Sequence, residues 1–121
     1  MRKTQGRWNL GLGWVPIGLL ETTGRRTGRT YQTPLLYDAF DSYLYLVASS
    51  GGSPKHPTWY WNAKDRPVVF YRGGQVLRGH MEETDGQDYA DAWNRFRAFN
   101  PGFDTYNERV DRHIPILRMK I

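Results

Sequence analysis

Apolar residues in the first half of the chain fall into short runs that are separated by turns rich in glycine or aspartate. Runs of this length, bounded by such turn residues, are typical of β-strands. The third run, YLYLVA, is almost wholly apolar and predicts a central strand. Pro34 lies inside the second run, and because proline cannot donate a ladder hydrogen bond it predicts a sheet edge or a bulge. The predicted strands span residues 17–23, 30–38 and 43–48.

The second half of the chain predicts helices as well as strands. His56 and Pro57 are expected to begin a helix that runs to about residue 65, since proline fits the first helical turn. Gly73 and Gly74 separate two strand-like runs, which indicates a β-hairpin. Residues 88–99 repeat apolar side chains at three- and four-residue steps and predict an amphipathic helix. The other expected elements are strands at 68–71, 75–83 and 114–119 and a short helix at 103–110.

Together these elements predict one α+β domain over residues 17–121, after an N-terminal arm of residues 1–16. The short connections favour antiparallel pairing, so we expect about six strands in a small, mostly antiparallel sheet or barrel. The arm is basic and rich in tryptophan, and Gly11 and Gly13 disfavour a helix there. We favour an arm whose tryptophans pack on the domain; peripheral contact with a membrane surface is the alternative.

Composition narrows the class of partner. The 121 residues carry a formal net charge of +5 and 15% aromatic residues, which favours an anionic partner and rings that line a cleft. Acids alternate with the basic residues after residue 80, so nucleic-acid binding is not expected. The absence of cysteine excludes disulfides, thiolate nucleophiles and cysteine-based metal sites. With no signal-peptide pattern and no long apolar run, we expect a cytoplasmic protein, either a monomer or a homodimer.

A turn of sequence TGRRTGR follows the first predicted strand. Arg25, Arg26 and Arg29 can present planar, forked donors to phosphate or carboxylate oxygens. The glycines let the backbone approach a ligand closely. A solvated hairpin turn whose arginines keep the protein soluble explains the same composition equally well.

The segment SSGGSPKHPTW, between the third strand and the first helix, is the second candidate site. It offers hydroxyl and backbone donors, one lysine, a helix N-terminus and a large ring. The alternative is a strand-to-helix loop with a core tryptophan. The segment matches neither the nucleoside-triphosphate motif GxxxxGK[ST] nor the dinucleotide motif GxGxxG, and the chain lacks the hydrolase motif GxSxG. The histidines of the chain do not have the spacing of metal ligands, so no metal is expected. The candidate residues are Ser49, Ser50, Gly51, Gly52, Lys55, Thr58 and Trp59.

The late segment NPGFDTYNERVDRHIP holds the third candidate. Phe103 and Tyr106 lie three residues apart and would share a face if the segment is helical. They would form an aromatic wall over a ligand, with Tyr106 able to donate a proton. Core packing with a surface ion pair explains these residues better when they are taken alone.

Four segments in this order resemble the deazaflavin-dependent nitroreductase family, actinobacterial oxidoreductases that use coenzyme F420: TTGRRTG, TPLLY, ASSGGSPKHPTWYWN and PGFDTYNERVDRHIP. The resemblance runs from about Leu19 to the C-terminus. It implies a six-stranded, mostly antiparallel split β-barrel of the FMN-binding type with two to four flanking helices. It implies hydride transfer from reduced F420 to an electrophilic acceptor, namely an activated C=C bond, a quinone or a nitro compound. The anionic phosphate and polyglutamate tail of F420 would suit the basic turns.

The resemblance also implies roles for individual residues. Arg25 and Arg26 match the turn that binds the cofactor tail. Tyr106 or water would be the proton donor. Ser49, Gly51 and Gly52 match the loop beside the deazaflavin ring. Thr58 and Trp59 match the helix start that contacts the deazaflavin. The substrate pocket would be formed by Leu36, Trp59, Phe103 and Tyr106.

The chain departs from the family pattern at several positions. Ser50 and Tyr31 stand where many members have a lysine and an arginine, so Arg29 and Lys55 are expected to supply compensating charge. Phe103 and Leu36 replace tyrosines of the nitro-reducing members, which weakens the expectation of nitro reduction. A non-catalytic split-barrel carrier of FMN, haem or fatty acid is the alternative function, with FMN as the alternative cofactor.

Overall fold

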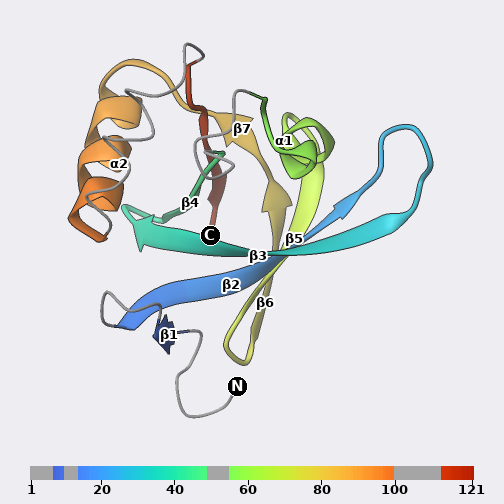
Figure 1. Ribbon diagram of the computed structural model, residues 1–121, viewed down its shortest axis with the longest axis horizontal. Coiled ribbons are helices and arrows are strands. Elements are labelled where there is room, and N and C mark those ends of the chain that lie inside the picture. The colour runs from blue at the N-terminus through green and yellow to red at the C-terminus, as the bar shows by residue number, and fades with distance from the viewer. Residues whose placement is uncertain (1–6, 10–13, 49–54, 100–112) are drawn as a thin grey trace.

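A mostly antiparallel sheet that closes almost into a barrel forms the body of the protein (Figure 1). The computed structural model describes residues 7–9, 14–48, 55–99 and 113–121. The strands and helices are β1 (Arg7–Asn9), β2 (Trp14–Thr23), β3 (Thr30–Phe40), β4 (Tyr43–Val47), α1 (Thr58–Ala63), β5 (Pro67–Arg72), β6 (Gln75–His80), β7 (Glu82–Glu83), α2 (Gly86–Phe99) and β8 (Ile116–Lys120).

The strand order explains how the barrel nearly closes. Along the sheet it is β6-β5-β2-β3-β4-β8-β7, and β1 pairs with β2 beside this path. The two end strands, β6 and β7, follow one another in the chain and are separated only by Met81. Met81 exchanges backbone hydrogen bonds with residues just before β5: its N–H donates to Arg66 O at 3.0 Å, and its carbonyl accepts from Asp65 N at 2.9 Å. The predicted α+β split-barrel class is therefore confirmed, although the strand count exceeds six.

The long strand β3 belongs to two parts of the sheet. Its first half, residues 30–36, pairs with β2, and its second half, residues 37–40, pairs with β4. We call β6, β5, β2 and residues 30–36 the first sub-sheet, and residues 37–40 with β4, β8 and β7 the second sub-sheet. Pro34 lies in the first half, where, among the described strands, β3 is paired on one side only, as expected for a proline at a sheet edge.

Two apolar clusters lie on opposite faces of β4. Leu44 and Leu46 point into the barrel and join a cluster that includes Leu20, Phe70 and residues of α1. The alternate residues Tyr45 and Val47 pack outward against α2. Because both faces of β4 are buried, the strand is apolar throughout rather than alternating. Figure 1 shows α2 beside β4 and α1 at one end of the barrel.

Most predicted elements appear with small shifts at their ends. The expected helix at 56–65 is the shorter α1, and the helix at 88–99 begins earlier, at Gly86. The single strand expected at 75–83 is two strands, because the chain turns at Met81 to meet β8. Part of the expected N-terminal arm is the strand β1, whose Arg7 pairs with Pro16. The helix expected at 103–110 lies outside the described residues.

Candidate functional site

The turn of residues 24–29 is a closed loop of hydrogen bonds. Gly24 N donates to Arg29 O at 2.7 Å, and Gly28 N donates to Gly24 O at 2.9 Å. Gly28 has a φ of 73°, a conformation that glycine adopts without strain. A Cβ at position 24 would lie 2.7 Å from Thr27 Oγ1 and 2.8 Å from a ring carbon of Tyr31. The two glycines therefore fix the shape that presents Arg25 and Arg26.

Helix α1 holds this turn in place. The backbone N–H of Arg25 donates to Asn62 Oδ1 at 3.2 Å, and Asn62 is only 6% exposed. Arg66, just after the helix, donates from Nη1 to Thr23 O at 3.0 Å. Segments that lie about forty residues apart in the chain are thus joined at the point where β2 ends.

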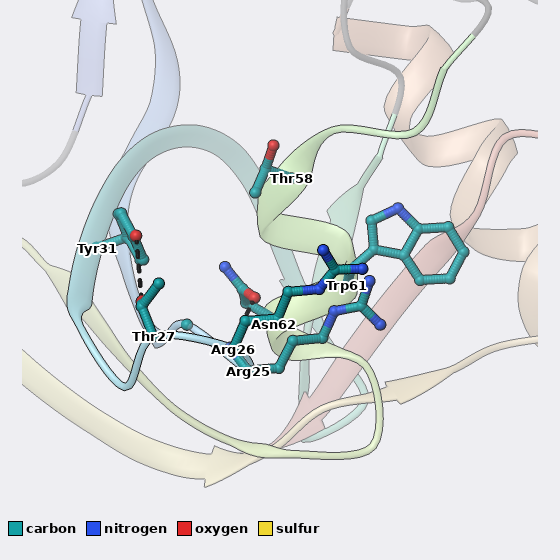
Figure 2. Close-up of a pocket in the computed structure, with 8 residues that line it drawn as sticks. Arg25, Arg26, Thr27, Tyr31, Thr58, Trp61 and Asn62 are labelled. Atoms are coloured by element: carbon teal, nitrogen blue, oxygen red, sulfur yellow. Dashed lines mark hydrogen bonds between the residues drawn. The ribbon is translucent and has the colours of Figure 1, made fainter.

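A pocket of about 430 Å³ lies between the turn and α1 (Figure 2). Helical spacing explains which residues of α1 face it: Thr58, Trp61 and Asn62 are three and four residues apart and share one face. The other face, which carries Trp59 and Tyr60, packs into the barrel. The pocket is lined by Gly24, Arg25, Arg26, Thr27, Tyr31, Thr58, Trp61 and Asn62.

The pocket has positive charge without a matching acid. Among the described residues, its lining includes two arginines and no aspartate or glutamate. Within the described part of the chain, neither Arg25 nor Arg26 forms an ion pair, whereas Arg118 contacts both Glu82 and Asp88. Two guanidinium groups with free donors, next to hydroxyl and amide groups, form a suitable receptor for phosphate or carboxylate oxygens.

Two exposed aromatic rings line the same pocket. Tyr31 is 43% exposed and Trp61 is 42% exposed, and they lie on opposite sides of the turn in Figure 2. The hydroxyl of Tyr31 lies 3.4 Å from Thr27 Oγ1. Across the β2–β3 ladder, Tyr31 faces Thr22, whose buried hydroxyl has no hydrogen-bond partner among the described residues.

Helix α1 is also fixed on its buried side. Tyr60 is 4% exposed and donates its hydroxyl proton to Glu83 Oε1 at 2.6 Å. Lys64 Nζ lies 3.5 Å from the same oxygen. Burial, and then the adjacent Glu83 carboxylate, raise the pKa of Tyr60 above its ordinary value of 10.0, so the phenol remains a donor.

The structure brings some of the expected site residues together and separates others. Arg25, Arg26 and Thr58 line one pocket, whereas Arg29 and Lys55 are exposed and outside its lining. Trp59 is 6% exposed and packs in the barrel core, so its ring is not presented to the pocket. Leu36 packs against the cluster beneath α2. Outside the described residues lie Ser49, Ser50, Gly51, Gly52, Phe103 and Tyr106.

Five lining residues were not among the expected site residues: Gly24, Thr27, Tyr31, Trp61 and Asn62. The spacing of Thr58, Trp61 and Asn62 is a sequence signal that could have identified the side of α1 that faces the pocket. The position of Tyr31 depends on the β2–β3 register, and its only sequence signal was the family resemblance, in which many members have an arginine there. In the described ranges, no three histidine or acidic residues are grouped to hold a metal ion, and no helix has the length and hydropathy of a membrane span.

Comparison with known proteins identifies the family of this chain. The model of the F420H(2)-dependent quinone reductase family matches residues 1–120, so the chain belongs to this family. The F420H(2)-dependent quinone reductase Rv1261c of Mycobacterium tuberculosis is 33% identical over 109 residues, which cover 87% of this chain and 73% of that protein. These matches confirm the deazaflavin-dependent resemblance seen in the sequence motifs.

Solved structures agree with the family assignment. The F420-H2-dependent reductase FDR-A has a TM-score of 0.76 and 31% identity, covering 87% of this chain and 94% of its own. A second structure, described as a domain-swapped dimer, has a TM-score of 0.79 and 31% identity, covering 87% of this chain and 80% of its own. A haem storage protein of Vibrio cholerae, at 8% identity and a TM-score of 0.63, shares the fold alone. The protein is therefore an oxidoreductase enzyme that uses F420 as its cofactor.

Proposed function

We propose that this enzyme reduces quinones with F420H2 and holds the anionic part of the cofactor in the pocket of Arg25 and Arg26. The observation that carries the proposal is a pocket with two guanidinium groups, no acidic residue among the described residues that line it, and a turn hydrogen-bonded to α1. Relatives named as quinone reductases support a quinone as the acceptor. Activated C=C bonds and nitro compounds remain alternative acceptors for the same site.

The residues of the pocket fit the cofactor's phosphate and glutamate groups. Arginine offers paired donors that match two oxygens of one phosphate or carboxylate. The hydroxyls of Thr27 and Thr58 and the ring of Tyr31 complete a polar cleft beside these donors. The deazaflavin, when bound, supplies the hydride, while the chain binds it, orients it and brings the acceptor to it.

Proton delivery is proposed for Tyr106, with water as the competing donor. An ordinary tyrosine pKa lies near 10, so an unperturbed phenol is a weak acid at neutral pH. The substitution Tyr106→Phe separates the two: a large loss of kcat with unchanged KM supports the phenol, and unchanged kcat assigns the proton to water.

The direct test of the proposal is a titration followed by turnover. Isothermal calorimetry with F420, and loss of F420H2 absorbance in the presence of a soluble quinone, should show binding and quinone-dependent oxidation. Arg25→Gln and Arg26→Gln should each weaken F420 binding about tenfold, because each removes a charge-assisted donor pair. Arg72→Gln is the matched control, since Arg72 lies over the ring of Tyr37, 5.8 Å from its centre, and does not line the pocket.

Two results would contradict the proposal. Absence of F420 binding at micromolar concentration would show that this pocket is not the cofactor site. An equal loss of affinity in Arg72→Gln would show that overall charge, rather than this pocket, attracts the cofactor.

A homodimer is the proposed assembly, because a structure with 31% identity is described as a domain-swapped dimer. Light scattering during size-exclusion chromatography tests it, and a monomer at tens of micromolar would overturn it.

A further inference from the structure

Trp61 occupies an unusual position for a large apolar side chain. It is 42% exposed on the wall of the pocket, yet its ring is held by two others. His56 meets it in an edge-on geometry with ring centres 5.4 Å apart, and Tyr60 does so at 4.8 Å. The indole is therefore fixed in orientation although much of its surface faces solvent.

The open face of this ring carries Arg25. The guanidinium carbon of Arg25 lies 5.4 Å from the ring centre of Trp61, within the range of a cation–π interaction. The backbone of Arg25 is bound separately, through its N–H to Asn62 Oδ1. Both ends of Arg25 are thus attached to α1. Arg26, beside it in the same pocket, has no such attachment among the described residues, although Figure 2 shows both side chains extending toward Trp61.

We propose that Trp61 is a positioning residue for the anion site: it holds the Arg25 guanidinium ready to bind a phosphate or carboxylate group of the ligand. The inference rests on the proposed function, since it concerns how that pocket binds its anion. A long side chain loses rotamer freedom when it binds, and a side chain that is ordered beforehand loses less. Trp61 raises affinity by this route without contacting the anion.

Three ligands and four variants test the inference by calorimetry. The ligands are F420, the form that keeps the phosphate but lacks the glutamates, and the deazaflavin without phosphate or glutamates. The variants are Trp61→Leu, Trp61→Phe, Arg25→Gln and the double variant Trp61→Leu/Arg25→Gln. Since Trp61 is partly exposed, Trp61→Leu should fold, and circular dichroism with a thermal melt verifies this.

Trp61→Leu should weaken F420 binding about two- to fivefold, the range of an exposed cation–π contact. It should leave binding of the deazaflavin without phosphate or glutamates unchanged. Trp61→Phe should restore most of the loss, and Trp61→Leu should have no further effect once Arg25 is glutamine. A loss that persists with the phosphate-only form assigns Arg25 to the phosphate, and a loss seen only with the full tail assigns it to the glutamates.

Two outcomes overturn the inference while leaving the proposed function intact. Equal weakening of all three ligands would mean that Trp61 contacts the deazaflavin itself. Additive losses in the double variant would mean that Trp61 and Arg25 act independently. Failure of the unaltered protein to bind any of the three would instead overturn the proposed function and, with it, this inference.

Discussion

At the scale of single residues, the pocket's unbalanced positive charge is the feature that can be changed most directly. In the part of the chain that the structure describes, Arg25 and Arg26 have no acidic neighbour in the lining that would compete with a bound anion. Tyr31 lines the same pocket and is 43% exposed, which leaves room for a longer polar side chain.

Tyr31→Arg should therefore strengthen F420 binding. A third guanidinium adds charge-assisted hydrogen bonds to the anion, and partial exposure screens them, so we expect a gain of about 1 kcal/mol. Calorimetry at low and high salt measures it, and the gain should shrink with added salt. Val76→Arg, on an exposed residue of β6, adds the same charge away from the pocket. An equal gain in that control would attribute the effect to net charge.

The sequence could indicate which arginines line the pocket, but not which tryptophan of α1 lines it. The GRRTG motif is local, so Arg25 and Arg26 could be found without tertiary structure. Trp59 and Trp61 lie two residues apart on opposite faces of α1, and the motif alone does not say which face is buried. Tyr31 reaches the pocket through the β2–β3 register, which depends on pairing between distant residues.

At the scale of elements, each helix donates one tyrosine hydroxyl to a group outside the helix. In α1, Tyr60 donates to Glu83 of β7, and in α2, Tyr89 donates to Ile114 O at 2.7 Å. The first contact positions the wall of the pocket, and the second joins α2 to the segment that leads into β8.

Tyr60→Phe should lower both stability and cofactor affinity. The substitution removes a short hydrogen bond to a carboxylate and leaves Glu83 with Lys64 as its ion-pair partner, at an expected cost of about 1–2 kcal/mol. Urea unfolding measures the free energy of unfolding and calorimetry the F420 affinity. Loss of stability with unchanged affinity would show that this bond does not position the pocket. Tyr71→Phe is the matched control, since Tyr71 also donates to a carboxylate, that of Glu21, at 3.1 Å outside the lining.

Tyr89 should make stability depend on pH in the alkaline range. Burial raises the pKa of Tyr89 from 10.0 to about 12. Above pH 10 the unfolded chain loses this proton while the folded protein keeps it, so the free energy of unfolding falls as pH rises toward about 12. Below pH 10 the contribution is constant.

Tyr89→Phe tests this by comparison. The free energy of unfolding of the unaltered protein minus that of Tyr89→Phe should not change with pH up to pH 10 and should decrease between pH 10 and 12. The raised pKa values of Tyr60 and Tyr71 affect both proteins equally and cancel. A flat difference throughout would contradict the burial of this phenol.

The types of the elements were largely predictable from the sequence, but the residues at which one strand ends and the next begins were not. Alternation and turn residues indicated β2 to β6 because these signals are local. The break between β6 and β7 at Met81 has no such local signal, because it depends on the hydrogen bonds of Met81 with Asp65 and Arg66 and on the pairing of β7 with β8. Closure of a barrel is a property of the whole sheet, so it sets boundaries that a local pattern does not contain.

At the scale of the whole molecule, the barrel depends on close packing where β2 pairs with β5. A Cβ at Gly18 would lie 2.2 Å from Phe70 Cζ and 2.9 Å from Tyr71 O. Phe70 is fully buried in the barrel cluster, so its ring has little room to move.

Gly18→Ala should destabilise the protein by about 1–3 kcal/mol through overpacking. Gly74→Ala is the matched control, because nothing lies within 4 Å of a Cβ there, and it should change stability by less than about 0.5 kcal/mol. Thermal and urea unfolding measure both. Adding Phe70→Leu to Gly18→Ala should recover part of the loss, and equal effects at positions 18 and 74 would refute the packing argument.

The strand β3, with one half in each sub-sheet, has a consequence for cooperativity. Residues 30–36 pair with β2 and residues 37–40 pair with β4, so one continuous strand must be ordered for both sub-sheets to form in full. At the other ends of the two sub-sheets, Met81 links β6 to β7 along the chain and is hydrogen-bonded to Asp65 and Arg66. Because the two sub-sheets share one strand, we expect secondary structure and tryptophan environment to be lost in one coincident transition on unfolding.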